Sequence, residues 1–328
     1  MPPATSPCPD TAAPFSDIFG GMQGWTDDGN QTHTGVVPEL PEVHALATDL
    51  GVRLTGRMVD RFELISFAAL KTFDPPVSTL AGRSIGPIGR HGKYLDIAFD
   101  SVHGDDRLHL LIHLARAGWI RWRDSAPNAP SAPGRGPLAA RLVLDDGAGL
   151  DITEAGTKKS LAIHLVRDAA EVPRVASLGP DPLDPGFTLS VFASILAGQG
   201  RSQIKGLLRN QAVIAGIGNA YSDEILHGAK MSPYAPASMA QDDVSRLYDA
   251  VQLTLRAAIA RADGLAASEL KREKKSHLQV HGRAGESCPV CGDVIRQVRF
   301  ADSSLEYCAT CQTGGKPLAD RVLSRLLK

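Results

Sequence analysis

Several features are missing from the sequence, and each absence removes a class of protein. No apolar run comes near the ~18 residues that a membrane-spanning helix requires, so no membrane segment is expected. The N-terminus has neither the basic segment nor the apolar segment of a secretory signal. Only five cysteines occur among the 328 residues, which does not suggest a secreted disulfide scaffold. The sequence therefore predicts a soluble, cytoplasmic protein.

Basic side chains are absent from residues 1–37, which contain four aspartates and five prolines. The segment has no helical or strand periodicity and too little apolar surface to order itself. Its lack of arginine also argues against a transit peptide. Val37 suggests a cause, because a GTG start codon is read as valine when a gene start is placed too far upstream. We expect a mis-assigned start, with a disordered extension or a processed leader as the alternatives.

Charge is distributed unevenly along the chain, although the formal net charge is only −1. Residues 38–200 carry 17 basic and 19 acidic side chains, whereas residues 201–328 carry 18 basic and 13 acidic ones. A basic C-terminal part of this kind favours binding to a polyanion.

Cysteines near the C-terminus form the strongest local motif. Two residues separate Cys288 from Cys291 and Cys308 from Cys311, and sixteen residues separate the two pairs. This spacing is typical of a zinc ribbon, in which four thiolates surround one structural Zn²⁺ tetrahedrally. Two disulfides or a redox pair are the alternatives. The fifth cysteine, Cys8, lies in the doubtful N-terminal segment, so zinc is favoured.

The period of the apolar residues changes along the chain. Between Val43 and Leu54 apolar positions follow a helical spacing, so a helix is expected after Pro41 that ends at Gly56. From about residue 57 to 166 the period becomes two. Strands are predicted at 95–99, 109–114, 118–122, 141–144 and 161–166. This half of the chain therefore indicates a β-sandwich that carries one N-terminal helix.

Prolines after residue 170 mark a linker, and the pattern beyond it becomes helical. A capping box from Ser238 to Gln241 predicts the start of a helix. That helix would bury Val244, Leu247, Val251 and Leu255. Within the ribbon, a hairpin is expected from residues 294–300 and 305–307.

A glycine-containing loop precedes another predicted helix. Gly216 and Gly218 would allow backbone N–H groups to approach an anion closely, at the N-terminus of that helix. Asn219 could cap the helix or donate to a phosphate. An ordinary helix–turn–helix hairpin is the alternative interpretation of this loop.

Short motifs occur along the chain in a characteristic order. They are Pro38-Glu39-Leu40-Pro41-Glu42-Val43, Gly89-Arg90-His91-Gly92-Lys93-Tyr94-Leu95, His113-Leu114, Leu178–Leu183, Ile204-Lys205, Gly216–Glu224, Leu278–Arg283 and the cysteine pairs. Together they resemble the Fpg/Nei family (formamidopyrimidine-DNA glycosylase and endonuclease VIII) of DNA repair enzymes over residues 38–312. The resemblance implies an α+β multidomain fold. Its parts would be an N-terminal helix plus β-sandwich over 38–170, a linker over 171–186, a helix–two-turn–helix domain over 187–283, a zinc finger over 284–312 and a basic tail over 313–328.

The resemblance also implies a chemistry that begins at Pro38. The α-amine of an N-terminal proline would attack C1′ of a flipped nucleotide, and the resulting iminium ion would permit β- and δ-elimination. In the numbered chain Pro38 follows Val37, so its nitrogen is a tertiary amide without a basic lone pair. The activity thus requires the loss of residues 1–37. Glu39 would shuttle protons to the opening sugar, and Lys93 would contact phosphate and assist proton transfer.

Further roles follow from the resemblance. The residues implied in DNA binding are His113, Arg116, Lys205, Asn219 and Arg299, and those implied in zinc binding are Cys288, Cys291, Cys308 and Cys311. The implied partner is damaged double-stranded DNA, with single-stranded or bubble DNA as further candidates. A monomer associated with the bacterial nucleoid is expected. Two other classes remain: a catalytically inactive DNA-lesion-binding protein, and a zinc-ribbon interaction module unrelated to repair.

Some positions depart from the family pattern. Ser303 aligns with the family's zinc-finger arginine, and Arg116 aligns with a methionine that fills the void left by the flipped base. The wedge loop contains residues 156–160, with two lysines, and residues 264–278 are short and basic where purine-specific members carry a lesion-capping loop. These departures favour oxidised pyrimidines, abasic sites or ring-opened purines over strict 8-oxoguanine specificity.

Overall fold

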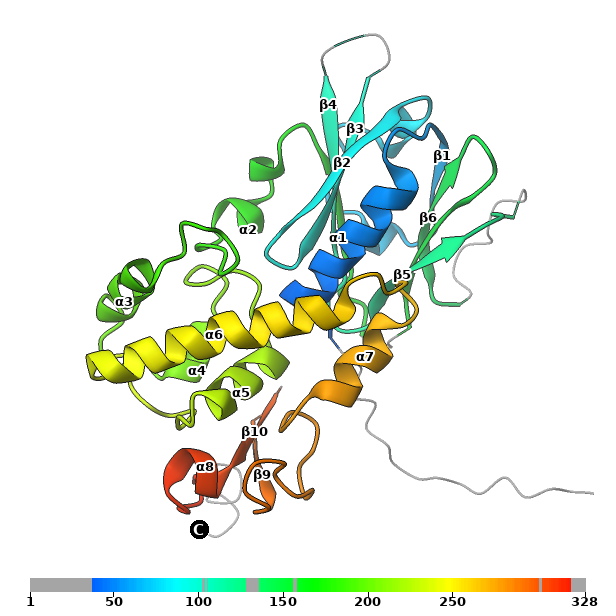
Figure 1. The fold of residues 1–328 in the computed structure, drawn as a ribbon. Helices are drawn as coiled ribbons and strands as arrows, with labels where there is room; N and C mark the ends of the chain where they lie inside the picture. Colours follow the sequence, from blue (N-terminus) through cyan, green and yellow to red (C-terminus); the bar gives the residue numbers. More distant parts are fainter. Residues whose placement is uncertain are drawn as a thin grey trace, which may run out of the picture. The chain divides into compact units, whose positions relative to one another are not determined.

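The computed structural model describes residues 37–319, apart from 102–103, 105, 128–135, 156–157 and 301–302. The predicted N-terminal leader, except Val37, and the end of the predicted basic tail lie outside the described residues. Figure 1 shows a sheet-rich part, a group of helices and a small C-terminal ribbon. Within the described ranges no helix has the length and apolar character needed to cross a membrane.

Two four-stranded antiparallel sheets form the N-terminal part, with the strand orders β1-β6-β7-β5 and β2-β3-β4-β8. The strands are β1 (Val59–Leu64), β2 (Ser84–His91), β3 (Tyr94–Asp100), β4 (Arg107–His113), β5 (Gly118–Arg123), β6 (Leu138–Leu144), β7 (Gly149–Glu154) and β8 (Ala162–Val166). Helix α1 (Leu40–Leu54) packs against β2 and β3, and its buried side chains join both sheets in one core. The predicted β-sandwich with an N-terminal helix is confirmed.

The second domain is helical and has its own core. It comprises α3 (Leu189–Ala197), α4 (Ile204–Arg209), α5 (Asn219–Gly228) and α6 (Gln241–Ala262). The apolar residues predicted to be buried by α6 are buried. The predicted capping box is wrong, because α6 begins at Gln241 and its N-cap is Ala240. Ser238 donates its backbone N–H to Gly200 O instead, which ties this stretch to the turn before α4.

Short helices fill several connections. They are η1 (Phe67–Ala69), η2 (Val77–Leu80), η3 (Ala169–Glu171) and α2 (Pro173–Ala176). A longer one, α7 (Leu270–His277), follows α6 and returns to the sandwich. Trp119 Nε1 donates to Ala267 O at 2.9 Å, and Lys271 Nζ lies 4.3 Å from the centroid of the Trp119 ring. The short basic segment of the sequence is therefore a helix docked on the N-terminal domain, with Leu270 in its core.

The C-terminal ribbon is an antiparallel hairpin of β9 (Ile295–Arg299) and β10 (Ser304–Cys308), followed by α8 (Ala309–Thr313). This confirms the predicted hairpin. Its buried side chains form two small clusters that are separate from the cores of the sandwich and of the helical domain. The ribbon therefore has little apolar burial of its own to stabilise it.

Candidate active site and zinc finger

The N-terminus of α1 meets the N-terminus of α5 at the centre of the candidate site. Pro38 and Glu39 are buried there. Leu40 N donates to Gly216 O at 3.0 Å, which joins the start of α1 to the loop before α5. Gly216 has a φ of +87°, in the left-handed region that favours glycine, and a Cβ on it would lie 2.6 Å from Leu40 Cδ1. The motif at Pro38–Val43 and the motif at Gly216–Glu224 thus come together in space.

Backbone N–H groups of α5 hold the Glu39 carboxylate. It accepts hydrogen bonds from Gly218 N at 2.6 Å, from Ala220 N at 2.9 Å and from the next N–H along the helix at 3.3 Å. A helix N-terminus favours a negative charge because its first N–H groups have no partner within the helix. Burial opposes ionisation, but the charges of Lys274 and Lys93 and these hydrogen bonds outweigh it and lower the pKa of Glu39. The carboxylate is therefore ionised at neutral pH.

Lys93 approaches the same point from the hairpin between β2 and β3. Gly92, with a φ of +55°, forms the tight turn that presents it. A Cβ on Gly218 would lie 2.6 Å from both Lys93 Nζ and Glu39 Oε1, so the two charged groups converge where only glycine leaves space. Burial lowers the pKa of Lys93, and the Glu39 carboxylate offsets part of that effect. A lysine with a lowered pKa beside an ionised carboxylate is suited to moving a proton.

A second buried lysine completes the site, although no sequence motif indicated it. Lys274 of α7 donates to Glu42 Oε2 at 2.8 Å and to Val37 O at 3.0 Å, and its Nζ lies 3.9 Å from Glu39 Oε1. Tyr221 OH donates to Glu42 Oε1 at 2.6 Å, and the Lys274 ammonium lies 4.5 Å from the centroid of the Tyr221 ring. The basic composition of α7 was the only signal, and it does not reveal which lysine turns inward.

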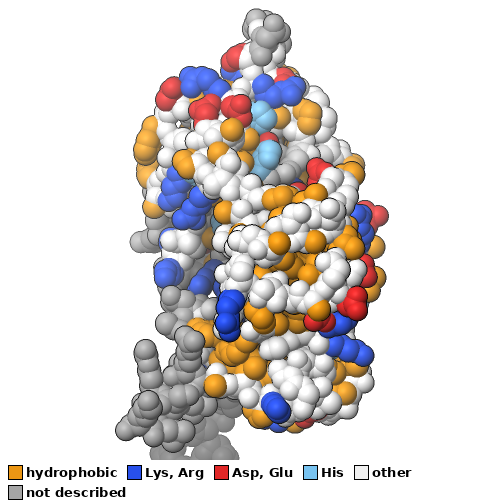
Figure 2. Space-filling model, turned by 90° about the vertical axis from the view of Figure 1, so that its left-hand side faces the viewer, with side chains coloured by type: hydrophobic (Ala, Val, Ile, Leu, Met, Phe, Trp, Pro, Cys, Tyr) orange, Lys and Arg blue, Asp and Glu red, His pale blue; other side chains and the backbone are white. Residues whose placement is uncertain are grey.

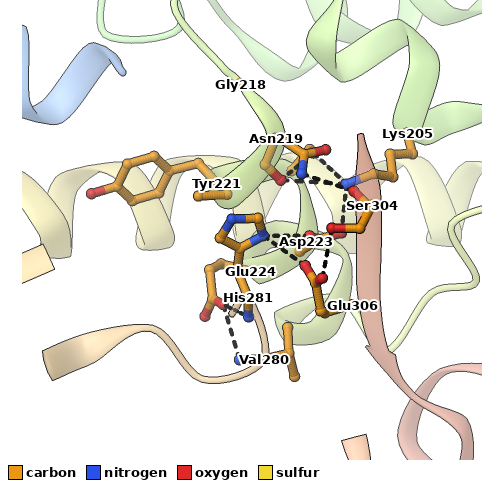
Figure 3. Close-up of polar contacts among 12 residues, drawn as sticks. Lys205, Gly218, Asn219, Tyr221, Asp223, Glu224, Val280, His281, Ser304 and Glu306 are labelled. Carbon is orange, nitrogen blue, oxygen red and sulfur yellow. Dashed lines mark hydrogen bonds and ion pairs between the residues drawn. The ribbon is translucent and has the colours of Figure 1, made fainter. Parts of the chain in front are cut away.

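An ionic network connects the helical domain to the zinc finger (Figure 3). His281 Nδ1 lies 2.8 Å from Asp223 Oδ2 and 2.9 Å from Glu306 Oε2. Burial opposes a charge on His281, but the two carboxylates raise its pKa to about 9, so the ring is a cation at neutral pH. Glu224 accepts three backbone N–H groups of residues 279–281, which fixes this loop against α5. The site residues predicted from the sequence did not include Asp223, Glu224, His281 or Glu306.

Lys205 and Asn219, both predicted to bind DNA, are engaged within the protein. The Lys205 side chain is 6% exposed, and its Nζ lies 2.5 Å from Asp223 Oδ1 and 2.9 Å from Ser222 Oγ. Its side chain therefore holds the first turns of α5, and a DNA contact of Lys205 stays a prediction. Asn219 Nδ2 donates to Ser304 O at 2.8 Å, while its buried Oδ1 has no hydrogen-bond partner among the residues that the structure describes.

The remaining predicted DNA contacts lie on the sandwich and the ribbon. His113, at the end of β4, pairs with Tyr94 of β3, and the two ring centroids are 4.8 Å apart. Burial and the charge of Lys93 lower the pKa of His113 to about 4, so it is a neutral hydrogen-bonding group. Arg116, in the turn before β5, and Arg299, on β9, are exposed. Figure 2 shows lysine and arginine side chains along the left edge of one face, as polyanion binding requires.

The four cysteines come together in the ribbon. Cys291 Sγ lies 3.3 Å from Cys308 Sγ, Cys288 Sγ lies 3.9 Å from Cys311 Sγ, and all four sulfurs are within 4.8 Å of one another. Zn–S bonds of about 2.3 Å place tetrahedral sulfurs about 3.8 Å apart, so this set fits one zinc ion. Gly292 provides the tight turn after the first pair, with a φ of +77°. The predicted structural zinc site is confirmed.

Comparison with family models covers most of the chain. Residues 37–157 match the N-terminal domain of formamidopyrimidine-DNA glycosylase, and residues 178–269 match the H2TH domain of the same enzyme. Residues 285–314 match a zinc finger found in FPG and IleRS. The matches follow the order of the three parts of the structure.

Proteins and solved structures that are similar to this chain are named as formamidopyrimidine-DNA glycosylases or as MutM. Formamidopyrimidine-DNA glycosylase of Moorella thermoacetica is 34% identical over 80% of this chain and 95% of its own length. An uncharacterized formamidopyrimidine-DNA glycosylase-like protein of Mycobacterium tuberculosis is 52% identical over 48% of this chain and 99% of its own length. Lactococcus lactis Fpg bound non-covalently to DNA containing an AP site has a TM-score of 0.71, with 27% identity over 84% of this chain and 99% of that one. MutM bound to DNA containing carbocyclic 8-oxo-G has a TM-score of 0.72, with 28% identity over 84% and 100%. The chain belongs to the formamidopyrimidine-DNA glycosylase family.

Proposed function

We propose that this protein is a bifunctional DNA glycosylase and AP lyase of base excision repair, and that its nucleophile is the α-amine of Pro38 in a chain that begins there. One observation carries the proposal. Glu39, the residue after Pro38, is buried and ionised on three N–H groups at the N-terminus of α5, counting the N-cap Gly218, with Lys93 beside it. A buried, pre-oriented carboxylate next to a secondary amine is what an amine nucleophile needs for proton transfer.

The chemistry assigns a task to each of these groups. The amine nitrogen of Pro38 forms a bond to C1′, and the base leaves with the electron pair of the glycosidic bond and takes up a proton. Opening of the sugar needs a proton on O4′, which Glu39 delivers after accepting the proton that the amine loses. The iminium ion at C1′ then acidifies the C2′ hydrogen. Loss of that proton expels the 3′ phosphate, and water finally releases the sugar from Pro38.

The substrate class follows from the parts that surround this centre. Helix α7, docked on the sandwich, occupies the segment in which purine-specific relatives were expected to carry a lesion-capping loop. Ser303 leaves the ribbon without an arginine at that position, and Arg299 is an exposed substitute on the same hairpin. We infer a preference for oxidised pyrimidines, abasic sites and ring-opened purines in duplex DNA, with single-stranded or bubble DNA as further substrates. A monomer in the bacterial cytoplasm is consistent with this activity.

One observation supports a second candidate, a DNA-lesion-binding protein without catalysis. In the full chain the Val37–Pro38 peptide is present, and Lys274 Nζ donates to its carbonyl oxygen at 3.0 Å. A chain that keeps this peptide has no amine at Pro38. It would still present the exposed cations and the zinc finger to DNA, so binding would persist without cleavage.

Replacement of the Glu39 carboxylate tests the proposed roles. In a chain that begins at Pro38, Glu39→Gln should slow excision of an oxidised pyrimidine by at least ~100-fold, the usual size of a lost acid–base step. Cleavage of a preformed abasic site should fall much less, because the base has already departed. Single-turnover assays on the two duplexes measure both rates. Equal losses on both substrates would contradict the role in sugar opening.

Gly218→Ala tests the crowding at the same carboxylate. The added Cβ would lie 2.6 Å from Glu39 Oε1 and from Lys93 Nζ, so we expect both charged groups to be displaced and base excision to fall ~100-fold or more. Gly206→Ala is the matched control, because a Cβ on that exposed glycine of α4 meets no atom within 4 Å. The control should keep full activity. Wild-type activity of Gly218→Ala would show that this geometry is not needed.

A further inference from the structure

The position of Lys274 relative to Pro38 has a consequence for the nucleophile. Its Nζ donates to Val37 O at 3.0 Å, and a peptide carbonyl oxygen lies about 2.3 Å from the nitrogen of the following residue. The Lys274 ammonium is therefore no farther than about 5.3 Å from the nitrogen of Pro38. In a chain that begins at Pro38, the carbonyl between the two nitrogens is absent, and two amino groups face each other at that range.

A cation at this distance disfavours a second positive charge on the proline amine. Only an unprotonated amine can attack C1′, so the neighbouring charge favours the reactive form. We propose that Lys274 keeps the Pro38 amine unprotonated, and therefore nucleophilic, in the chain that begins at Pro38. This inference rests on the proposed function of Pro38. It assigns Lys274 as a positioning residue that acts through the amine's protonation state.

The other charges around the amine make Lys274 necessary. The titratable groups around this point come from six elements. They are Glu39 and Glu42 from α1, Lys93 from the β2–β3 hairpin, His113 from β4, Arg209 from α4, Tyr221 from α5, and Glu273 and Lys274 from α7, with His281 farther along the ionic network. Glu39 and Glu42 would both stabilise a protonated amine. Lys93 and Lys274 are the cations next to these two carboxylates, and Lys274 binds Glu42 directly at 2.8 Å. Without Lys274 the buried Glu42 carboxylate would lose its direct counter-charge and would favour protonation of the amine.

Burial strengthens this effect. Lys274 is 2% exposed and Glu42 is likewise 2% exposed, so water screens their charges little. Helix α7 is held in place by Leu270 in the sandwich core and by the Trp119–Ala267 hydrogen bond. The ammonium is thus presented to Pro38 by a rigid element. The neighbouring Lys275 is exposed and makes no equivalent contact among the interactions of the described residues.

The experiment measures the protonation of the amine by two routes. Chains that begin at Pro38 are compared as wild type, Lys274→Met, Lys274→Arg and Lys275→Met. The first route is the pH profile of borohydride trapping on preformed abasic duplex under single-turnover conditions. The second, without DNA, is the pH dependence of reductive methylation by formaldehyde, read by mass spectrometry on the N-terminal peptide.

For Lys274→Met we expect the midpoint of the acid limb in both profiles to lie at a pH about one unit higher than in the wild type, because the pKa of the amine rises. The trapping rate on the alkaline plateau should be preserved. Lys274→Arg should keep the wild-type midpoint because it keeps the charge, and the exposed control Lys275→Met should also keep it. Adding Glu42→Gln to Lys274→Met should bring the midpoint back, since it removes the unbalanced carboxylate. That double variant also guards against misfolding from a buried unpaired charge.

Two results would overturn the inference. One is an unchanged methylation midpoint in Lys274→Met. The other is a trapping rate that falls equally at every pH, which a purely structural role of Lys274 would produce. The two routes also separate this inference from the proposed function. If no chain traps but the methylation midpoint shifts, Pro38 is not the nucleophile and the effect of Lys274 on its amine still stands.

Discussion

A chain that begins at Pro38 is expected to form a covalent complex with abasic-site DNA on borohydride treatment, whereas the 328-residue chain is expected to form none. The reason is electronic. The nitrogen of Pro38 in the longer chain is part of an amide, so its lone pair is delocalised and cannot form an iminium ion. We expect the difference to be at least ~100-fold, measured as the trapped fraction on denaturing gels.

Controls make this result specific. N-terminal sequencing must show Met1 intact in the long form and Pro38 first in the short form. In the short form, Pro38→Gly should retain some trapping, because a primary amine can also form a Schiff base. Equal trapping by the sequenced long form would assign the nucleophile to another amine. Lys93 and Lys274 would then be the first to test, since both lie beside Glu39.

Loss of one zinc ligand should have the second largest effect. Cys308→Ser leaves three thiolates, and the ribbon has too little apolar core of its own to remain folded without the metal. We expect zinc content to fall from about one per chain to near zero, and affinity for a lesion-containing duplex to fall ~100-fold or more. The melting transition of the sandwich should persist, because its core is separate.

Loss of the zinc would also affect the candidate active site, through one hydrogen bond between α5 and the ribbon. Asn219 Nδ2 donates to Ser304 O, and this bond depends on a folded hairpin. Metal analysis, fluorescence anisotropy with labelled duplex and calorimetry measure the three expected changes. Full DNA affinity of Cys308→Ser, or stoichiometric zinc bound elsewhere, would contradict the assignment. A Ser78→Ala variant, remote from the ribbon on η2, controls for handling and should resemble the wild type.

Much of the fold followed from periodicity, and the elements that did not have identifiable reasons. Strands β3, β4 and β5 show clear apolar runs or alternation and were predicted close to their true bounds. Strand β2 contains Pro87 and two glycines, and β1 and β7 contain charged residues, so their sequences lacked a strand signal. Their charged side chains are satisfied by cross-strand partners, such as Arg141 for Asp151 at 2.6 Å. Such long-range compensation is invisible to a local pattern.

In the candidate site, too, some residues could be predicted from the sequence and others could not. Pro38, Glu39, Lys93 and the loop before α5 carry motif signals, and the structure brings them together. Lys274 has none, because its role depends on the docking of α7 against the sandwich through contacts made far away in the sequence. Lys205 pairs with the buried carboxylate of Asp223, a partner that no local pattern reveals, and its contact with DNA stays a prediction.

The hydrogen bonds between Glu39 and the start of α5 place the carboxylate proposed for proton transfer among the contacts that join two domains. Glu39 belongs to the helix that packs on the sandwich, whereas its three N–H donors belong to the helical domain. Any motion that separated the domains would strip the carboxylate of its donors and leave it to bulk water. The position of the carboxylate proposed for proton transfer therefore depends on how the helical domain packs against the sandwich.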